Sequence, residues 1–410
     1  MHYSTHGIKI NKYDRILAVN YLMVLVAILF SKTMYFGVHT ASTFQYVFYA
    51  LCIFGFFYSK GSLSVLSTNL IRVGLLWLPL VIQILLNFDS FVPNGLNSVL
   101  GLMIKIVCSA FFASSMSNLR FRRCYVNIMY IICIASIPCF LISLFFPSVV
   151  RNLAMTSFQW QNTYEYSWFY TWGRAGTIIT KNAGPFWEQG AFQGFINLAI
   201  MFLMDSFRNN YSGPIIKYKK KLIVFLITVL TTQSTTGYIL CIFILMFFYR
   251  DIKTILISNR NGKNLKKVLV FIAAISVISY ILLSGNITNK LTNAETQSAA
   301  VRANDFIYSI SFILMGGLWG LGPTTKALML ESGAGLLSNS VGLLSMAYSY
   351  GLVFASVYVF FQYQYLKTFQ SEKSKLLVYI LIFLILHCTE GYWFLPVFLI
   401  MLMKFKKCED

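Results

Sequence analysis

Long apolar blocks separated by short polar connections run through this chain from one end to the other. Blocks of about 20 residues have the length that an α-helix needs to cross the hydrocarbon core of a bilayer. The pattern therefore predicts an all-α polytopic membrane protein with about 12 transmembrane helices. The predicted spans are residues 15–36, 41–58, 70–88, 98–114, 124–147, 184–204, 221–234, 235–249, 268–284, 339–363, 376–388 and 391–404.

Two pairs of these spans are short, 221–234 with 235–249 and 376–388 with 391–404. A polar break, Thr231-Thr232-Gln233-Ser234-Thr235-Thr236-Gly237, separates the first pair. We interpret each pair as a helical hairpin whose turn lies inside the outer surface of the protein, and two long single helices are the alternative. No small-residue cleavage site follows the first span, which we therefore expect to be a retained helix and not a removed signal peptide.

Composition supports the membrane class and argues against nucleic acid as a partner. Hydrophobic residues make up 57% of the 410 residues and charged residues 11%, whereas soluble domains carry roughly 25% charged residues. The formal net charge is +20. The basic residues lie between apolar blocks and do not line one soluble face, so they do not form a nucleic-acid surface.

The distribution of lysine and arginine predicts the orientation. If the N-terminus is cytoplasmic, 25 of the 33 basic residues fall in inner connections and seven in outer ones, with Lys105 inside a span. Because cytoplasmic connections carry the excess of basic residues, both termini are expected to be cytoplasmic. The inverted orientation would place the basic connections outside.

The connections divide the chain into five segments. They are N-terminal transmembrane helices in 1–147, a first long outer loop in 148–183, central helices in 184–284, a second long outer loop in 285–337, and C-terminal helices with a cytoplasmic tail in 338–410. Long loops on a packed scaffold tend to carry function. The second loop contains residues 301–310, whose apolar spacing predicts a helix lying along the membrane surface. A glycine-rich turn, 316–323, follows and would let the backbone approach a ligand closely.

Cysteine and histidine usage argues against a disulfide framework and against a bound metal. None of the eight cysteines lies in the two long outer loops. The sequence has no Cys-x-x-Cys pair and no His/Cys group with zinc spacing. We therefore expect no metal and no cofactor.

Several short segments, in order along residues 170–360, resemble the O-antigen and exopolysaccharide polymerases of the O-antigen ligase/polymerase superfamily. The first is Trp172-Gly173-Arg174-Ala175-Gly176 followed by Gly184-Pro185-Phe186-Trp187-Glu188, although Gln189 stands where many members have proline. The second is the Ser/Thr-rich stretch from Thr231 to Tyr238. The third is Arg302 with Gly320-Leu321-Gly322, and the last is Ser338-Asn339 leading to Tyr350-Gly351.

This resemblance implies a GT-C-like fold, as in membrane-embedded, lipid-carrier-dependent glycosyltransferases, in a bacterial cytoplasmic (inner) membrane. The implied reaction joins oligosaccharide repeat units linked to undecaprenyl diphosphate at the outer face of the membrane, without a nucleotide sugar. Implied partners are this lipid-linked oligosaccharide, membrane lipids, and a chain-length regulator and a flippase of the same pathway.

The implied chemistry selects candidate residues. Negative charge builds on the departing diphosphate, and arginine stays charged and grips phosphate oxygens with a planar fork. Arg302 and Arg174 are the best outer-face candidates, with Lys181 as a helper, and contact with lipid head groups is the alternative for each. Glu188 lies just inside an apolar span, where an ionised group is costly and usually functional. It could accept the proton of the attacking hydroxyl or hold one of the arginines in place.

Further residues are candidates for binding substrate, and each has a structural alternative. Polar residues of the hairpin turn could bind sugar hydroxyls or satisfy backbone groups in a broken helix. Lys105 could reach the carrier phosphate or extend toward the interface, and for His387 we favour a structural hydrogen bond. The substrate-binding candidates are Lys181, Gln233, Ser234, Thr235, Thr236 and Asn339.

Two other classes remain open beside the polymerase, a transporter or lipid flippase and a membrane-embedded scaffold in a glycan assembly complex, and a ligase is the closest rival among glycan enzymes. The ligase passes finished polymer to a lipid core, but that branch usually has a histidine before the asparagine, and this chain has Ser338 there. A lipid flippase or transporter would also have about twelve spans. Apart from Lys105, however, the spans lack charged residues that would form a path near the membrane midplane.

Overall fold

The computed structural model describes residues 12–88, 95–159, 162–177, 181–209, 214–256, 298–323, 342–369 and 373–407. Within these residues the protein is mostly helical. The first half contains α1 (Lys12–Phe30), the π-helix η1 (Met34–His39), α2 (Ala41–Tyr58), α3 (Leu63–Leu86), α5 (Gly95–Ser115), α6 (Asn118–Phe145) and α7 (Pro147–Leu153). The second half contains α8 (Gln189–Asn209), α9 (Ile215–Thr232), α10 (Thr235–Phe247), α11 (Tyr249–Leu256), α13 (Ser298–Gly316), α15 (Gly342–Leu366), the 3₁₀-helix η3 (Lys367–Phe369), α16 (Lys373–Thr389) and α17 (Pro396–Ile400).

Six helices in the described part of the chain are long and apolar enough to cross a membrane. They are α2, α3, α5, α6, α8 and α15 with η3. Large apolar side chains on these helices are exposed, Phe57 and Ile71 among them, and exposed apolar surface on this scale fits contact with lipid. These features are those of a membrane-embedded protein. The predicted total of twelve spans is not tested, because the span at 268–284 lies outside the described residues.

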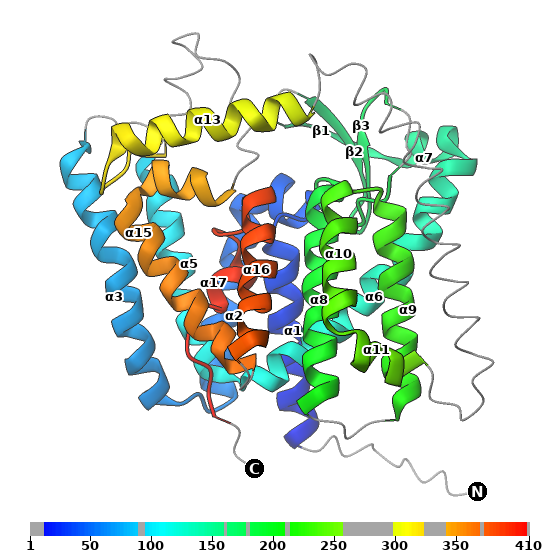
Figure 1. Cartoon of the computed structure of the whole chain (residues 1–410), viewed down its shortest axis with the longest axis horizontal. Coiled ribbons are helices and arrows are strands. Elements are labelled where there is room, and N and C mark those ends of the chain that lie inside the picture. The colour runs from blue at the N-terminus through cyan, green and yellow to red at the C-terminus, as the bar shows by residue number, and fades with distance from the viewer. Residues whose placement is uncertain are drawn as a thin grey trace, which may run out of the picture.

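The helices form a bundle with two distinct ends (Figure 1). The β-strands and α13, which runs across the other helices, lie at one end, here called the sheet end. The start of α1 lies at the opposite end, here called the terminal end. The helix expected within residues 301–310 is therefore confirmed as part of α13.

Helix α8 forms the centre of the bundle. Its apolar window is 94% buried, whereas the other candidate spans are 22–50% buried. A helix that is apolar on all sides can be stable only when it is enclosed. Helices α6, α9 and α10 pack around it.

The segment 148–183, predicted as a long loop, contains a short helix and a small sheet within an otherwise mostly helical protein. After α7, strands β1 (Met155–Gln159), β2 (Asn162–Tyr166) and β3 (Thr171–Arg174) form a three-stranded antiparallel sheet in the order β1-β2-β3. Tyr164 and Tyr166 of β2 are buried. Strands rich in threonine and aromatic residues suit a half-buried pleated surface.

The first predicted hairpin is confirmed, since α9 and α10 pack against each other and are separated at Gln233 and Ser234. Gln233 adopts a left-handed conformation (φ 50°), which ends α9. The Ser234 side chain accepts a hydrogen bond from the Gly237 N–H at 3.3 Å and caps the start of α10. The turn between them lies toward the sheet end (Figure 1).

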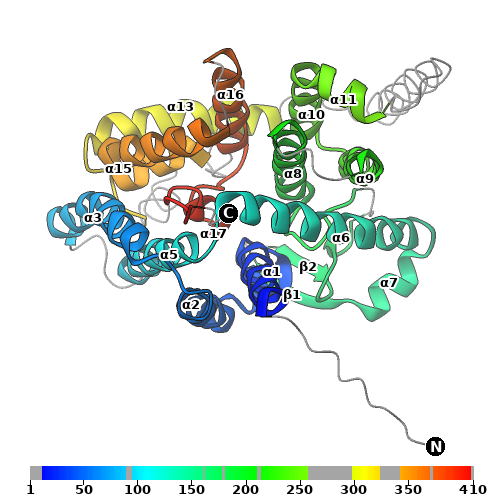
Figure 2. The same cartoon turned by 90° about the horizontal axis from the view of Figure 1, so that it is seen from below.

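The second predicted hairpin is wrong in its second half. Helix α16 is present, but residues 391–404 contain α17, a helix of five residues, and then continue as turns and irregular chain to residue 407. Residues 396–403 are almost completely buried, and Figure 2 shows α17 between α5, α6 and α16. Irregular backbone at membrane depth is tolerated where protein encloses it.

Polar side chains of the surrounding helices satisfy the backbone of this C-terminal segment. The Asn69 amide accepts from the Lys404 N–H at 2.7 Å and donates to the Lys404 carbonyl at 2.9 Å. Arg72 donates to the Leu402 carbonyl at 2.6 Å, and Gln362 donates to the Phe398 carbonyl at 3.1 Å. These side chains replace the intrahelical hydrogen bonds that a spanning helix would have made.

Candidate functional site

The junction between α1 and η1 is held against the segment that leads into α8. The Met34 N–H donates to the Pro185 carbonyl at 2.7 Å, and Thr33 forms an isolated antiparallel bridge with Phe186. Directly before this bridge, Lys32 has a φ of 61°, a conformation that is uncommon for a residue with a long side chain. The backbone at Gly37 lies so close to Lys32 that a Cβ atom there would be 2.6 Å from its Cα. The bridge therefore fixes Lys32 beside the start of α8.

The start of α8 carries Glu188. Its carbonyl accepts the Phe192 N–H at 3.2 Å, so Glu188 occupies the N-cap position, where the positive end of the helix dipole favours a carboxylate. The Trp187 indole N–H donates to Glu188 Oε1 at 3.0 Å. The ammonium group of Lys32 lies 4.7 Å from the centroid of the Trp187 ring, within the range of a cation–π contact.

A second carboxylate comes from the turn between α16 and α17. A Cβ atom on Gly190 would be 2.9 Å from Glu390 Oε1 and 3.8 Å from Glu188 Oε1, so the two carboxylates converge over this glycine. In the same turn, the Phe394 ring centroid lies 4.6 Å from the Lys32 ammonium group. The Tyr392 hydroxyl ties this turn to α8 by donating to the Gly190 and Ala191 carbonyls at 3.0 and 3.1 Å.

Lys105 of α5 completes the group. Its ammonium nitrogen lies 5.3 Å from the centroid of the ring of Phe30, the last residue of α1 and two residues before Lys32 in the chain. Lys32, Lys105, Glu188 and Glu390 are called the charged cluster below. They come from the junction between α1 and η1, from α5, from the residue before α8, and from the α16–α17 turn.

The predicted cation Arg174 lies outside the charged cluster's contacts. It ends β3, where Gly173 with a φ of 122° precedes it, and its side chain is exposed. Its carbonyl accepts from the Thr177 hydroxyl at 2.7 Å. In the same region Arg151 pairs with the largely buried Glu165 at 3.5 Å, which gives these two charges a structural role in the sheet.

Lys181 is half-buried and directly precedes a buried anchor, Asn182. The Asn182 N–H donates to the Thr231 carbonyl at 2.9 Å, and its side-chain amide donates to Ser136 Oγ at 3.2 Å. The predicted substrate-binding turn at 231–238 is thereby joined to the segment after the sheet. Ser234 caps α10, so its side chain satisfies a backbone group of the broken helix. Gln233 forms the left-handed turn between the two helices. Thr235 is exposed and Thr236 is half-buried.

The predicted cation Arg302 lies in the first turns of α13, and its side chain, like all of Asn339, lies outside what the structure describes. The glycine-rich turn after α13 approaches backbone of the same chain. A Cβ atom on Gly320 would be 2.4 Å from the Gly351 nitrogen, and Gly351 interrupts α15 with φ 89° and ψ 159°. The Leu321 N–H donates to the Tyr348 carbonyl at 2.8 Å. These glycines therefore allow the turn after α13 to lie directly against the backbone of α15.

His387 has the structural role that the sequence favoured. Its imidazole is buried, with Nε2 3.1 Å from the Tyr358 hydroxyl and Nδ1 3.0 Å from the Phe383 carbonyl. Both ring nitrogens are thus engaged with the protein. The sequence missed the central position of Lys32, for which the available signal was a lysine placed directly after an apolar span.

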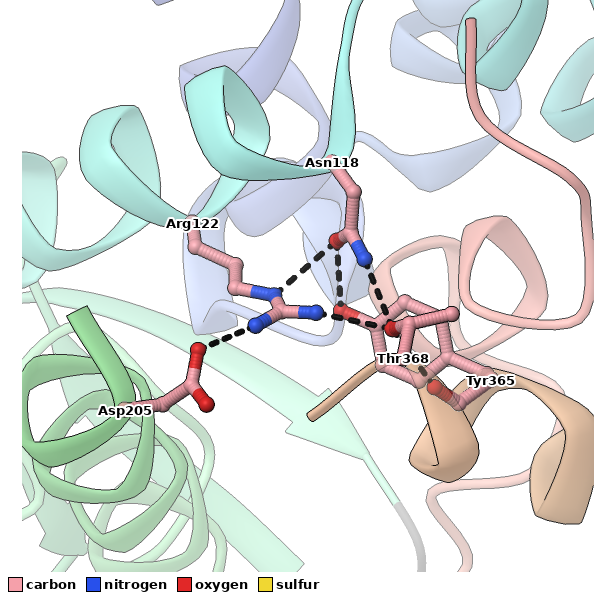
Figure 3. Close-up of polar contacts among 5 residues, drawn as sticks. All are labelled: Asn118, Arg122, Asp205, Tyr365 and Thr368. Carbon is pink, nitrogen blue, oxygen red and sulfur yellow. Dashed lines mark hydrogen bonds and ion pairs between the residues drawn. The ribbon is translucent and has the colours of Figure 1, made fainter. Parts of the chain in front are cut away.

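Figure 3 shows a second charged group, here called the Arg122 network. Arg122 of α6 forms a buried ion pair with Asp205 of α8. Arg122 Nε donates to Asn118 Oδ1 at 3.0 Å, and Nη2 donates to Thr368 Oγ1 at 2.8 Å. The guanidinium carbon lies 3.7 Å from the centroid of the Phe369 ring. The network joins α6, α8 and the end of α15.

The charged cluster combines the chemical groups that group transfer requires. Its two lysines can balance negative charge on a ligand, its two carboxylates can accept a proton, and Trp187 and Phe394 offer aromatic faces. In the described residues, no group of three or more His, Cys, Asp or Glu side chains comes together with the geometry for a metal ion. No family model matches this chain, and no curated protein is significantly similar to it.

Proposed function

We propose that this chain is a membrane glycosyltransferase that polymerises oligosaccharide repeat units carried on a polyprenyl diphosphate. The observation that carries the proposal is the convergence of Glu188 and Glu390 over Gly190, with Lys32 against Trp187 and Phe394 and Lys105 against Phe30. Glu188 also belongs to the Trp-Glu pair on which the resemblance to the polymerases rests.

The proposed reaction requires a cation and a proton acceptor. The bond between the anomeric carbon and the diphosphate oxygen breaks, and the polyprenyl diphosphate leaves with the bonding electron pair. A hydroxyl oxygen of the second lipid-linked unit forms the new bond to that carbon, and its proton passes to the Glu188 carboxylate. The Trp187 indole, which donates to Glu188 Oε1 at 3.0 Å, supports this role because it fixes the orientation of the carboxylate.

Cations at the sheet end would neutralise the departing diphosphate. We assign this role to Arg302 and Arg174, with Lys181, Lys32 and Lys105 as further positive charge. Helix α13 and strand β3 lie at the same end of the bundle (Figure 1), which supports a shared role for the two arginines. Preorganised charges of this kind are the largest single contribution in many enzymes, because they need no reorganisation during the reaction.

The proposal includes the orientation in the membrane. The sheet end faces outward from a bacterial cytoplasmic membrane, and twelve spans in a GT-C-like arrangement leave both termini in the cytoplasm. The excess of basic residues in the connections assigned to the inside supports this orientation. A flippase that delivers the lipid-linked unit and a regulator of chain length are the proposed partners in the same pathway.

The decisive experiment is extension of purified lipid-linked repeat units by the purified protein, without metal or nucleotide sugar. The wild-type protein is expected to form polymer. Arg302→Ala is expected to abolish extension at normal protein levels, and Arg302→Lys to lose much of it, since an ammonium group cannot grip two phosphate oxygens as a fork. Glu188→Gln is expected to slow extension about 10²- to 10³-fold, the scale for loss of one preorganised polar group.

Glu165→Gln is the matched control, since Glu165 is a carboxylate of the sheet that lies outside the charged cluster. It is expected to retain most of the activity. Normal polymer length from Arg302→Ala would contradict the assigned site. Transfer of finished chains to a lipid core would identify a ligase, and movement of the lipid-linked unit without bond formation would identify a flippase.

A further inference from the structure

A cavity of about 460 Å³ opens near the terminal end, between α1, α6, α8 and α9. Four basic residues line it, Arg120 and Arg123 from α6 and Lys217 and Lys221 from α9. None of the described residues that line the cavity is an aspartate or a glutamate. We call this cavity the basic pocket. Its volume falls in the range of small-molecule binding sites, about 300–1,000 Å³.

Two acidic residues on the neighbouring helices α8 and α11 have other partners. Asp205 of α8 forms the buried ion pair with Arg122. Asp251 of α11 accepts a hydrogen bond from Arg208 at 2.8 Å. Like charges gathered around one cavity raise its positive potential and attract anions. The positive charge of the pocket therefore favours the binding of an anion.

A buried hydroxyl in the pocket wall points to the same conclusion. Ser206 lines the pocket and is 7% exposed, and its Oγ has no hydrogen-bond partner among the described residues. A buried polar atom without a partner is costly, so a ligand oxygen that accepts its proton would remove that cost. Nearby, the Asn127 amide links the Lys221 ammonium group and the Tyr21 hydroxyl. These two hydrogen bonds fix the polar side chains of this wall before an oxygen-rich ligand binds.

We propose that the basic pocket binds a phosphate group, carried either by the head group of an anionic lipid or by a soluble phosphate compound. Charge-assisted hydrogen bonds from arginine and lysine are the strongest means of holding such a group. A basic pocket between membrane helices near one end of the bundle has the usual form of an anionic head-group site. The site is distinct from the charged cluster, and its test requires no glycan substrate.

The test measures binding of dioctanoyl phosphatidylglycerol to the purified full-length protein in a neutral detergent by calorimetry. Dioctanoyl phosphatidylcholine and inorganic phosphate are titrated in parallel. Phosphatidylglycerol is expected to bind more tightly than phosphatidylcholine, with an affinity that falls as salt is added. If inorganic phosphate competes with it, a soluble phosphate compound can fill the pocket, and if it does not, the site requires a lipid.

Paired charge variants separate the pocket from general surface charge. Lys217→Gln with Lys221→Gln is expected to weaken phosphatidylglycerol binding about tenfold or more, since each basic residue near a charged head group contributes about 1 kcal/mol. The matched control is Lys220→Gln with Lys253→Gln, which removes the same charge from exposed residues outside the pocket. It is expected to change the affinity by less than about twofold.

Ser206→Ala tests the buried hydroxyl directly. The ligand-free variant is expected to unfold at an equal or higher temperature, because the substitution removes a buried hydroxyl that has no hydrogen-bond partner among the described residues. Its affinity for phosphatidylglycerol is expected to fall severalfold. Equal binding of both phospholipids, or equal loss in the two lysine pairs, would overturn the proposal.

Discussion

The charged cluster and the Arg122 network use the same residue types in opposite ways. In the Arg122 network, one guanidinium is enclosed by a carboxylate, an amide, a hydroxyl and an aromatic ring, all within direct contact. In the charged cluster, two lysines and two carboxylates meet around a glycine and the faces of Trp187 and Phe394. A buried ion pair by itself therefore does not mark a site. The difference lies in the surroundings of the charges, which are polar partners around one guanidinium in the Arg122 network and a glycine with two aromatic rings in the charged cluster.

The largest expected effect breaks the Arg122 network. Asp205→Ala leaves the Arg122 guanidinium buried without its carboxylate, and this is expected to lower the free energy of unfolding by about 3–5 kcal/mol. Thermal unfolding of the purified protein in detergent measures the change. The double variant Arg122→Met with Asp205→Leu is expected to recover most of the loss, because it removes the buried charge as well. An unchanged unfolding temperature in Asp205→Ala would show that the ion pair is not a structural brace.

A smaller effect on stability, but a larger one on activity, is expected for Gly190→Ala in the charged cluster. The new Cβ would meet Glu390 Oε1 at 2.9 Å, and the flexible carboxylate would move away. Extension of lipid-linked units is expected to fall about tenfold if this carboxylate contributes one interaction of 1–2 kcal/mol to the transition state. Stability is expected to stay equal or to rise by up to about 1 kcal/mol, since alanine favours helix over glycine.

Gly194→Ala is the contrasting variant on the same helix. Its Cβ would meet the Tyr392 hydroxyl oxygen at 2.1 Å, and that hydroxyl is held by two backbone carbonyls of α8. This variant is expected to lose stability. If Gly190→Ala also lost stability while keeping its activity, the role assigned to the Glu390 carboxylate beside Gly190 would be wrong.

The smallest expected effect sharpens the comparison from the structural side. Thr368→Val removes the hydroxyl that accepts from Arg122 and from Asn118, at 2.8 and 2.9 Å. The expected loss is about 1–2 kcal/mol of unfolding free energy, because the remaining acceptors still hold the guanidinium. Activity measured well below the unfolding temperature is expected to stay unchanged. A clear loss of activity there would mean that the network communicates with the sheet end.

The sequence predicted helices well where the bilayer sets their length. The apolar run 41–58 coincides with α2, and the polar break at 231–237 separates α9 from α10. The sequence-based prediction failed at residues 391–404, because a run of apolar residues indicates burial and does not by itself indicate a helix. The side chains that replace the missing helical hydrogen bonds, such as Asn69 and Gln362, are remote in the sequence.

The sheet and the charged cluster show two further limits of the sequence. Strands β1–β3 have four or five residues each, so their signal was no stronger than that of an aromatic loop. Glu188 was identifiable as a carboxylate at the start of an apolar block. The position of Lys32 beside it depends on the bridge between Thr33 and Phe186, two residues far apart in the sequence. Contacts of that kind follow from tertiary packing.

The irregular segment at residues 396–407 has a consequence for how the molecule is made. During synthesis this segment emerges after every helix that encloses it, and with few backbone hydrogen bonds of its own it cannot partition into lipid alone. The segment takes its place among helices that have already packed together. Until then the side-chain amides of Asn69 and Gln362 lack their hydrogen bonds to its backbone. Insertion of the earlier helices by the translocation machinery and final maturation of the fold are thus separate events, and an incompletely matured chain would expose polar groups to membrane quality-control proteases.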